Sequence, residues 1–314
     1  MSAYKPQLPA QLGVAIVAPG GYAPDEAALM RGIALLEAQG CCVHNYYNPR
    51  QKHQRFGGTD EARVAQLHAA AANPDVKIVL ALRAGYGMTR ILPALDLDLL
   101  AHSGKLFVGY SDFTALQMAL LKRNGTITFA GPMMCDDFNR EDVSSFTMSH
   151  FWRCMTQDTQ VIEWTADGNP AVDVAGTLWG NNLAMLVNLL GTPYFPQIDG
   201  GILFLEDINE HPFRIERMLL QLESAGVLAR QKAIVLGDFS GGRLSDYDNG
   251  YNFDTMLAYL RARFSLPVLT GLPFGHIRDK LTLPIGAQAR LEAQGSSLRL
   301  TLSGYPVLRQ FSTV

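Results

Sequence analysis

Ser111 stands in the segment GYSDFTAL (109–116), after the apolar run LFV and before a stretch with helical spacing. A serine there can cap the helix, because its oxygen accepts a backbone N–H of the first turn. It can also act as a nucleophile at a strand-to-helix corner, where Gly109 permits a tight turn and the helix N-terminus stabilises negative charge. The α/β-hydrolase pattern G-x-S-x-G is half met, since Phe113 occupies the second glycine position. The local sequence leaves both roles open.

A nucleophilic serine needs a base, and the base needs an acid that orients it. Of the seven histidines, His276 lies in the irregular segment PFGHIRD, and such loops on a rigid scaffold often carry functional side chains. Glu206 ends the apolar run GILFL, where a carboxylate needs a partner because its desolvation is costly. Glu206 or its neighbour Asp207 could equally stabilise the N-terminus of the helix that Pro212 opens. Strand alternation predicts that these two carboxylates point to opposite faces.

Two glycine-containing segments could supply hydrogen-bond donors for an oxyanion. RAGYG (83–87) follows one predicted strand as GYSD follows the next. Adjacent parallel strands place both loops at the same sheet edge, so the N–H groups of Gly85 and Asp112 could converge on one oxygen. Ordinary tight turns explain the glycines equally well. The chain has neither a G-x-G-x-x-G motif nor a P-loop, so no nucleotide cofactor is indicated.

Composition excludes several classes of protein. The 314 residues are 48% hydrophobic and 18% charged, which is typical of a globular chain of about two domains. A net charge of -3 with scattered Lys and Arg argues against nucleic-acid binding. The first residues do not resemble a leader, and no apolar run reaches the ~18 residues of a membrane span, so we expect a cytoplasmic protein that does not bind membranes. The cysteines form no C-x-x-C pair and predict buried free thiols rather than a metal site or disulfides: Cys41, Cys42, Cys135 and Cys154.

The elements that must position these residues fall into two groups. In the first half, strands predicted at 14–18, 42–46, 76–82 and 106–109 alternate with helical patterns, which indicates a parallel α/β domain over residues 1–158. In the second half, strands at 201–208 and 232–239, a helix from Pro212 to near Gly226 and a terminal hairpin turning at 295–296 indicate a mixed α+β domain over 159–314. The candidate residues come from both halves, so we expect the site between the two domains.

Taken in order, these segments resemble the serine L,D-carboxypeptidases, or muramoyltetrapeptide carboxypeptidases. The similarity covers nearly the whole chain and is carried by IVAPGGY, FGGTDEAR, RAGYGMTRILPALD, GYSDFTAL, TFAGPM, GTLWGNNLAML, FLEDINEHPFRIERML, AIVLGDFSG and GLPFGH. Each motif is weak alone, but the ordered series is specific. The sequence departs from the usual family pattern at Ala84, where glycine is common, and at Asn181, where WGGN is common.

The resemblance implies a catalytic triad and two oxyanion donors, without a metal or other cofactor. The implied triad is Ser111, His276 and Glu206, and the donors are the backbone N–H groups of Gly85 and Asp112. The implied activity is release of the terminal D-alanine from murein tetrapeptides in peptidoglycan recycling, through an acyl-enzyme, by a homodimer. The substrate carboxylate needs a cationic or N–H partner, and the sequence does not identify which arginine, if any, supplies it.

Two other functions fit the same residues. A related branch resembles immunity enzymes that hydrolyse peptide-nucleotide antibiotics, and it would share the triad but differ in the contacts of its pocket. A non-catalytic binder of cell-wall fragments would use the interdomain cleft without chemistry, although the intact serine, glutamate and histidine argue against it.

Overall fold

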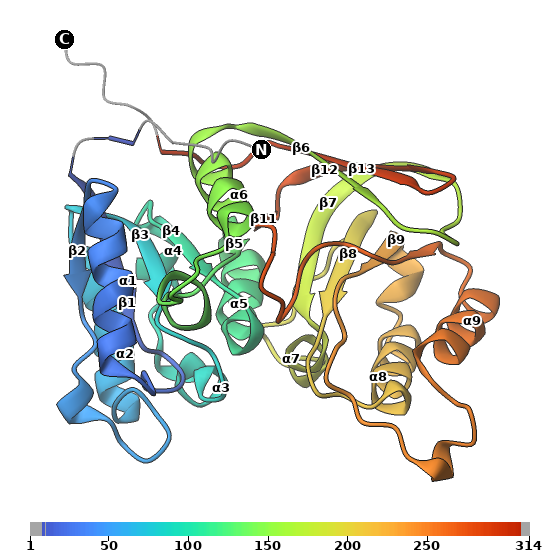
Figure 1. Ribbon diagram of the computed structural model, residues 1–314, viewed down its shortest axis with the longest axis horizontal. Coiled ribbons are helices and arrows are strands. Elements are labelled where there is room, and N and C mark those ends of the chain that lie inside the picture. Colours follow the sequence, from blue (N-terminus) through green and yellow to red (C-terminus); the bar gives the residue numbers. More distant parts are fainter. Residues whose placement is uncertain (1–7, 10, 309–314) are drawn as a thin grey trace.

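Two β-sheets lie side by side in the computed structural model, which describes residues 8, 9 and 11–308 (Figure 1). The strand order is β11-β5-β4-β3-β1-β2 in the first sheet and β10-β9-β8-β7-β12-β13-β6 in the second. Residues 1–7 and 10, on which the expectation of a chain without a leader mainly rests, lie outside the described residues. The described part of the chain contains no helix with the length and apolar character that a bilayer span requires.

The first sheet is the predicted parallel α/β layer. Its parallel strands are β1 (Leu12–Val17), β2 (Cys41–Asn45), β3 (Val76–Ala81), β4 (Leu106–Gly109) and β5 (Thr128–Ala130). Its helices are α1 (Glu26–Ala38), α2 (Asp60–Ala72), α3 (Met88–Ile91), α4 (Leu97–His102) and α5 (Thr114–Asn124). The central strands are buried almost throughout, which explains their continuous apolar runs. An antiparallel strand from the second half of the chain, β11 (Leu283–Ile285), pairs with β5 and covers that edge.

The second sheet is half parallel and half antiparallel. Its strands are β6 (Thr159–Thr165), β7 (Val172–Asn182), β8 (Gly201–Glu206), β9 (Gln231–Leu236), β10 (Val268–Leu269), β12 (Gln288–Gln294) and β13 (Ser297–Ser303). The long strand β7 joins the halves, since it pairs antiparallel with β12 at its start and parallel with β8 at its end. Burial alternates along β6, β12 and β13 but is continuous in β8, as expected for sheets covered on one or both faces.

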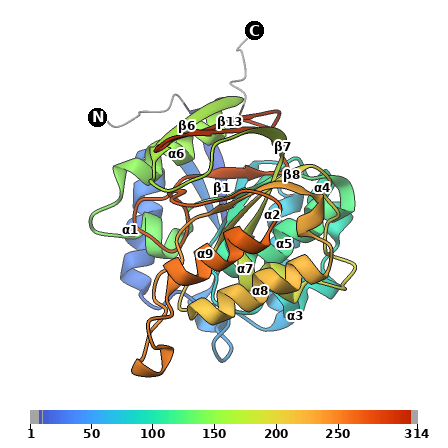
Figure 2. The same ribbon diagram turned by 90° about the vertical axis from the view of Figure 1, so that its right-hand side faces the viewer.

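The remaining helices are α6 (Ser145–Thr156), α7 (Leu183–Asn188), α8 (Pro212–Ser224) and α9 (Phe253–Arg263). Helices α7, α8 and α9 lie in front of the second sheet in the view of Figure 2, and they contact one another in sequence order. Helix α5 of the first half packs against α7 and β7 of the second. One cluster of buried apolar side chains runs through both halves, so their relative position is fixed by a shared core.

Candidate active site

Ser111 lies in a strained turn at the carboxyl end of β4. The 3₁₀ turn Ser111–Phe113 leads from the strand into α5, and the φ angle of Ser111 is +59°, in the left-handed region that non-glycine residues seldom adopt. Neither this turn nor α5 has a side-chain cap, so the structure excludes the capping role. A serine held in a strained strand-to-helix turn is the geometry of a nucleophile elbow.

The turn forms because Gly109 lets an aromatic ring pack against the backbone. A Cβ atom on Gly109 would lie 2.7 Å from the Phe113 ring, so this approach requires glycine. The end of β4 is further fixed by Gln117, whose Nε2 donates to the carbonyl of Gly109 at 3.0 Å and to that of Phe129 at 2.9 Å. Phe113 thus occupies the position of the second glycine in G-x-S-x-G, and its ring stabilises the turn.

Glu206 and His276 are joined by a hydrogen bond, although they come from distant parts of the chain. The distance from His276 Nδ1 to Glu206 Oε2 is 2.7 Å, the carboxylate is fully buried and the imidazole is 17% exposed. The other carboxylate oxygen accepts from Asn182 Nδ2 at 3.1 Å. Glu206 is thus occupied by these two partners and does not serve α8, whose N-cap is His211. A buried carboxylate on Nδ1 leaves Nε2 as the ring nitrogen that can take up a proton.

Asp207 lies beside Glu206 and binds the same amide. Its Oδ1 accepts from Asn182 Nδ2 at 3.0 Å, and its oxygens also accept from the backbone N–H groups of Ala184 and Ile208. The prediction that the two carboxylates diverge is wrong, because β8 ends at Glu206 and strand alternation stops there. Burial is the main reason that the pKa of Asp207 rises to about 6.

Sequence analysis missed Asn182, which joins the two halves of the site. Besides holding both carboxylates, its backbone N–H donates to Thr114 Oγ1 at 3.3 Å, on the helix that follows Ser111. Its own side-chain oxygen caps α7 by accepting from Met185 N. An asparagine between a strand and a helix is a recognisable capping signal, but the local sequence does not predict its contacts with residues far away in the chain.

Tyr110, the residue before Ser111 in the chain, contacts His276. The Tyr110 and His276 rings meet edge to face, with centroids 5.0 Å apart. No hydrogen bond between His276 and Ser111 is found among the described residues. The Tyr110 hydroxyl accepts from Lys280 Nζ at 3.0 Å, and that ammonium also pairs with Asp137 at 2.6 Å, fully buried. Sequence analysis missed this cluster; the only signal was a lysine flanking the apolar segment LTLP.

The two candidate oxyanion loops lie side by side, as predicted. Strands β3 and β4 are parallel neighbours, and Asp112 Oδ2 accepts from the N–H of Met88 at 2.8 Å, which ties the loops together. Burial raises the pKa of Asp112. Gly85 has a φ angle of +95°. Apart from bonds internal to its helices and strands, the described part of the chain has no backbone hydrogen bond from the N–H of Gly85 or of Asp112.

The two departures from the family pattern both lie close to this site. Ala84 is buried, and its carbonyl accepts from Gly21 N at 2.9 Å, which joins the loops after β3 and β1. Asn181 has a φ angle of +117°, a conformation that favours glycine. Its Nδ2 donates to Gln117 Oε1 at 2.9 Å, whereas its Oδ1 is buried without a hydrogen-bond partner.

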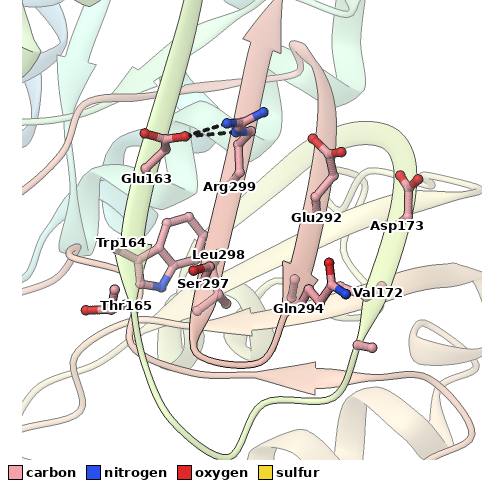
Figure 3. Close-up of a pocket in the computed structure, with 12 residues that line it drawn as sticks. Glu163, Trp164, Thr165, Val172, Asp173, Glu292, Gln294, Ser297, Leu298 and Arg299 are labelled. Carbon is pink, nitrogen blue, oxygen red and sulfur yellow. Dashed lines mark hydrogen bonds and ion pairs between the residues drawn. The ribbon is translucent and has the colours of Figure 1, made fainter.

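A hollow of about 1090 Å³ lies elsewhere, on strands β6, β7, β12 and β13 (Figure 3). Its walls carry cross-strand polar pairs such as Glu163 and Arg299, 2.7 Å apart. None of the candidate site residues lines it, so this hollow is separate from the chemistry.

The described His, Cys, Asp and Glu residues include no group of three placed as metal ligands would be. All four cysteines are free thiols, and burial raises the pKa of Cys41 and Cys135 to about 12. The prediction that all four are buried is wrong for Cys42, which is exposed on an outward-facing position of β2.

Two mixed α/β sheets, with candidate reacting groups drawn from both halves of the chain, define an α/β protein whose candidate active site combines the two halves. The chain belongs to the LD-carboxypeptidase family: residues 14–131 match its N-terminal domain and residues 175–291 its C-terminal domain. It is therefore a peptidase.

Individual relatives agree with this family. The chain is 32% identical over 283 residues to a probable murein peptide carboxypeptidase of Bacillus subtilis, with 88% of each chain covered. The crystal structure of a muramoyltetrapeptide carboxypeptidase from Oxalobacter formigenes is 55% identical, with a TM-score of 0.90 over 94% of this chain and all of that one. The microcin C7 self-immunity protein MccF of Escherichia coli is 26% identical over 279 residues, covering 78% of this chain and 79% of MccF. A solved MccF structure, 21% identical with a TM-score of 0.86 over 97% of this chain and all of its own, shares the fold.

Proposed function

We propose that the protein is a serine L,D-carboxypeptidase that releases the terminal D-alanine from murein tetrapeptides in peptidoglycan recycling. The observation that carries the proposal is the 2.7 Å hydrogen bond between buried Glu206 and His276, whose ring packs on Tyr110, next to the strained turn of Ser111. The names of the relatives from Bacillus subtilis and Oxalobacter formigenes support the choice of a murein peptide as substrate.

In the proposed mechanism, His276 Nε2 removes the proton from Ser111, and the serine oxygen attacks the carbonyl carbon before the terminal D-alanine. Glu206 holds the imidazole in the required tautomer and stabilises its protonated form. The N–H groups of Gly85 and Asp112 bind the tetrahedral oxyanion, where one lost donor typically costs ~3 kcal/mol of transition-state stabilisation. His276 then protonates the departing amine of D-alanine and activates a water that hydrolyses the acyl-enzyme.

Release of D-alanine from a murein tetrapeptide tests this proposal directly. Ser111→Ala should lower kcat by at least ~10³-fold with the fold unchanged, because no other group can form the acyl-enzyme. The matched control is Ser296→Ala in the exposed hairpin turn, which should keep full activity. Activity retained by Ser111→Ala would reject the nucleophile, and no D-alanine from the unaltered protein would reject the function.

The second candidate is hydrolysis of a peptide-nucleotide antibiotic, which the similarity to MccF supports. The two activities would use the same triad and differ in the contacts of the pocket. Turnover of both substrate classes, measured as kcat/KM under the same conditions, separates them. The identity of 55% to the Oxalobacter protein favours the murein peptide.

A division into domains at residues 1–158 and 159–314, a cytoplasmic location and a homodimer stay predictions. The proposed boundary falls between α6 and β6. Sedimentation velocity tests the homodimer, which should have twice the mass of the chain.

A further inference from the structure

We propose that Arg83 binds the C-terminal carboxylate of the substrate and thereby directs cleavage to the last peptide bond. The inference rests on the proposed function, because it assigns the carboxylate-binding residue of that same site.

The chemistry of a carboxypeptidase sets the position of such a residue. In the substrate only one residue, spanning about 3.5 Å, separates the scissile carbonyl from the free carboxylate. The group that binds the carboxylate must therefore lie close to the groups that bind the oxyanion. Arginine suits this task, because its planar guanidinium donates two parallel hydrogen bonds to a carboxylate.

Arg83 is at the required place in the fold. It follows β3 and stands two residues before Gly85, at the sheet edge that also carries Ser111. Its aliphatic stem lies over the loop after β1, where its Cδ would be 3.4 Å from a Cβ atom on Gly21. The adjacent carbonyl of Leu82 accepts from the N–H of Cys135, in the turn after β5, at 2.7 Å. The residue thus stands where the loops from three strands meet.

The fold gives the Arg83 guanidinium no hydrogen-bond or ion-pair partner among the described residues. Its Nε is buried without a hydrogen-bond partner, and no ion pair or ring contact of Arg83 is found among the described residues. Arg83 as a whole is only partly buried, so the rest of its guanidinium is open to an incoming carboxylate, whose negative charge would offset the cost of the unpaired Nε donor. We expect such an unpaired donor at a site whose last hydrogen-bond partner arrives with the substrate.

The other arginines at this edge already have partners. Arg63 is fully buried, donates to the carbonyls of Pro19 and Gly87 and pairs with Asp60, which gives it a structural role. Arg90 also pairs with Asp60, at 3.1 Å. Arg55 is exposed, and its guanidinium lies 5.9 Å from the Tyr86 ring centroid.

The test compares two substrates, a murein tetrapeptide with a free D-alanine carboxylate and the same peptide ending in D-alaninamide. The unaltered enzyme should prefer the free acid. Arg83→Met should lower kcat/KM for the acid by about 10- to 100-fold, the usual effect of losing a hydrogen bond to a charged group, and leave the amide unchanged. Arg83→Lys should recover part of the preference, because it restores the charge but not the paired donors.

Arg55→Met is the matched control, since it removes a neighbouring arginine of the same edge and should keep the preference for the acid. Thermal melting of each variant checks that the fold persists. An unchanged acid-to-amide ratio in Arg83→Met, or an equal loss on both substrates, would overturn the assignment of Arg83 alone. Absence of D-alanine release by the unaltered enzyme would overturn the proposed function as well.

Discussion

The orientation of one imidazole depends on a single buried carboxylate. Glu206 is fully buried and uses one oxygen for His276 and the other for Asn182. Removing a charge from such a pair leaves its shape nearly intact but changes which protonation state of the ring is stable. A substitution of Glu206 that removes its charge but keeps its shape therefore separates the electrostatic contribution to catalysis from the contribution of packing.

Glu206→Gln should lower kcat by about 10³- to 10⁴-fold while KM changes little, because a neutral amide no longer stabilises the protonated imidazole and can present its NH₂ to Nδ1. Steady-state kinetics on the murein tetrapeptide measures both parameters. Glu210→Gln, which neutralises a carboxylate on the loop before α8, is the control and should behave like the unaltered enzyme. A fall in kcat of less than tenfold in Glu206→Gln would argue against the proposed triad.

At the scale of elements, the sequence predicted those parts of the fold that depend on local pattern. The apolar runs of β3 and β8, the helix α8 and the terminal hairpin lie within a few residues of their predicted limits. Strand β11 escaped notice because three residues carry no usable periodicity, and only pairing with β5 defines it. Asn182 and Lys280 escaped for the same reason, since their partners are 24 to 170 residues away in the chain.

The end of strand β8 makes a measurable contribution to the pH dependence of stability. Burial raises the pKa of Asp207 from 3.8 to about 6, so the folded state binds this proton more tightly than the unfolded state. Its contribution to the free energy of unfolding is complete below the unfolded pKa of 3.8 and is lost as the pH rises through about 6, by up to ~1.4 kcal/mol per pH unit.

Urea denaturation between pH 4 and pH 7 checks this contribution by comparing the unaltered protein with Asp207→Asn. As the pH rises, the unaltered protein should lose unfolding free energy relative to Asp207→Asn, because the variant has no carboxyl proton to release at this position. A constant difference across this range would contradict the raised pKa.

At the scale of the whole molecule, the loop that carries His276 is bound to the opposite half of the chain. The Thr147 hydroxyl of α6 donates to the carbonyl of Arg278 and accepts from the N–H of Lys280, both at 2.9 Å. Ser144 donates to Asp279 at 2.5 Å. The proposed base thus comes from the second half in sequence but is positioned by the first, where Ser111 lies.

The buried pair of Lys280 and Asp137 holds this loop in place. Removing one of the two charges should cost more stability than removing both. Lys280→Met leaves a buried carboxylate unpaired and should lower the free energy of unfolding by about 3–5 kcal/mol. Adding Asp137→Leu removes both charges and should recover most of that loss, because neither ion then needs desolvation. Urea denaturation of both variants measures the difference.

The control is Arg290→Met, which breaks an ion pair of similar length, 2.8 Å, with the exposed Asp173. Solvent screens that pair, so the loss should stay below about 1 kcal/mol. Equal losses in Lys280→Met and Arg290→Met would show that the buried pair does not hold the two halves together. A stable double variant with reduced kcat would instead show that the cluster has two separate roles, one in stability and one in catalysis. In that variant the loop would still be packed, but the Tyr110 hydroxyl would have lost the lysine that binds it.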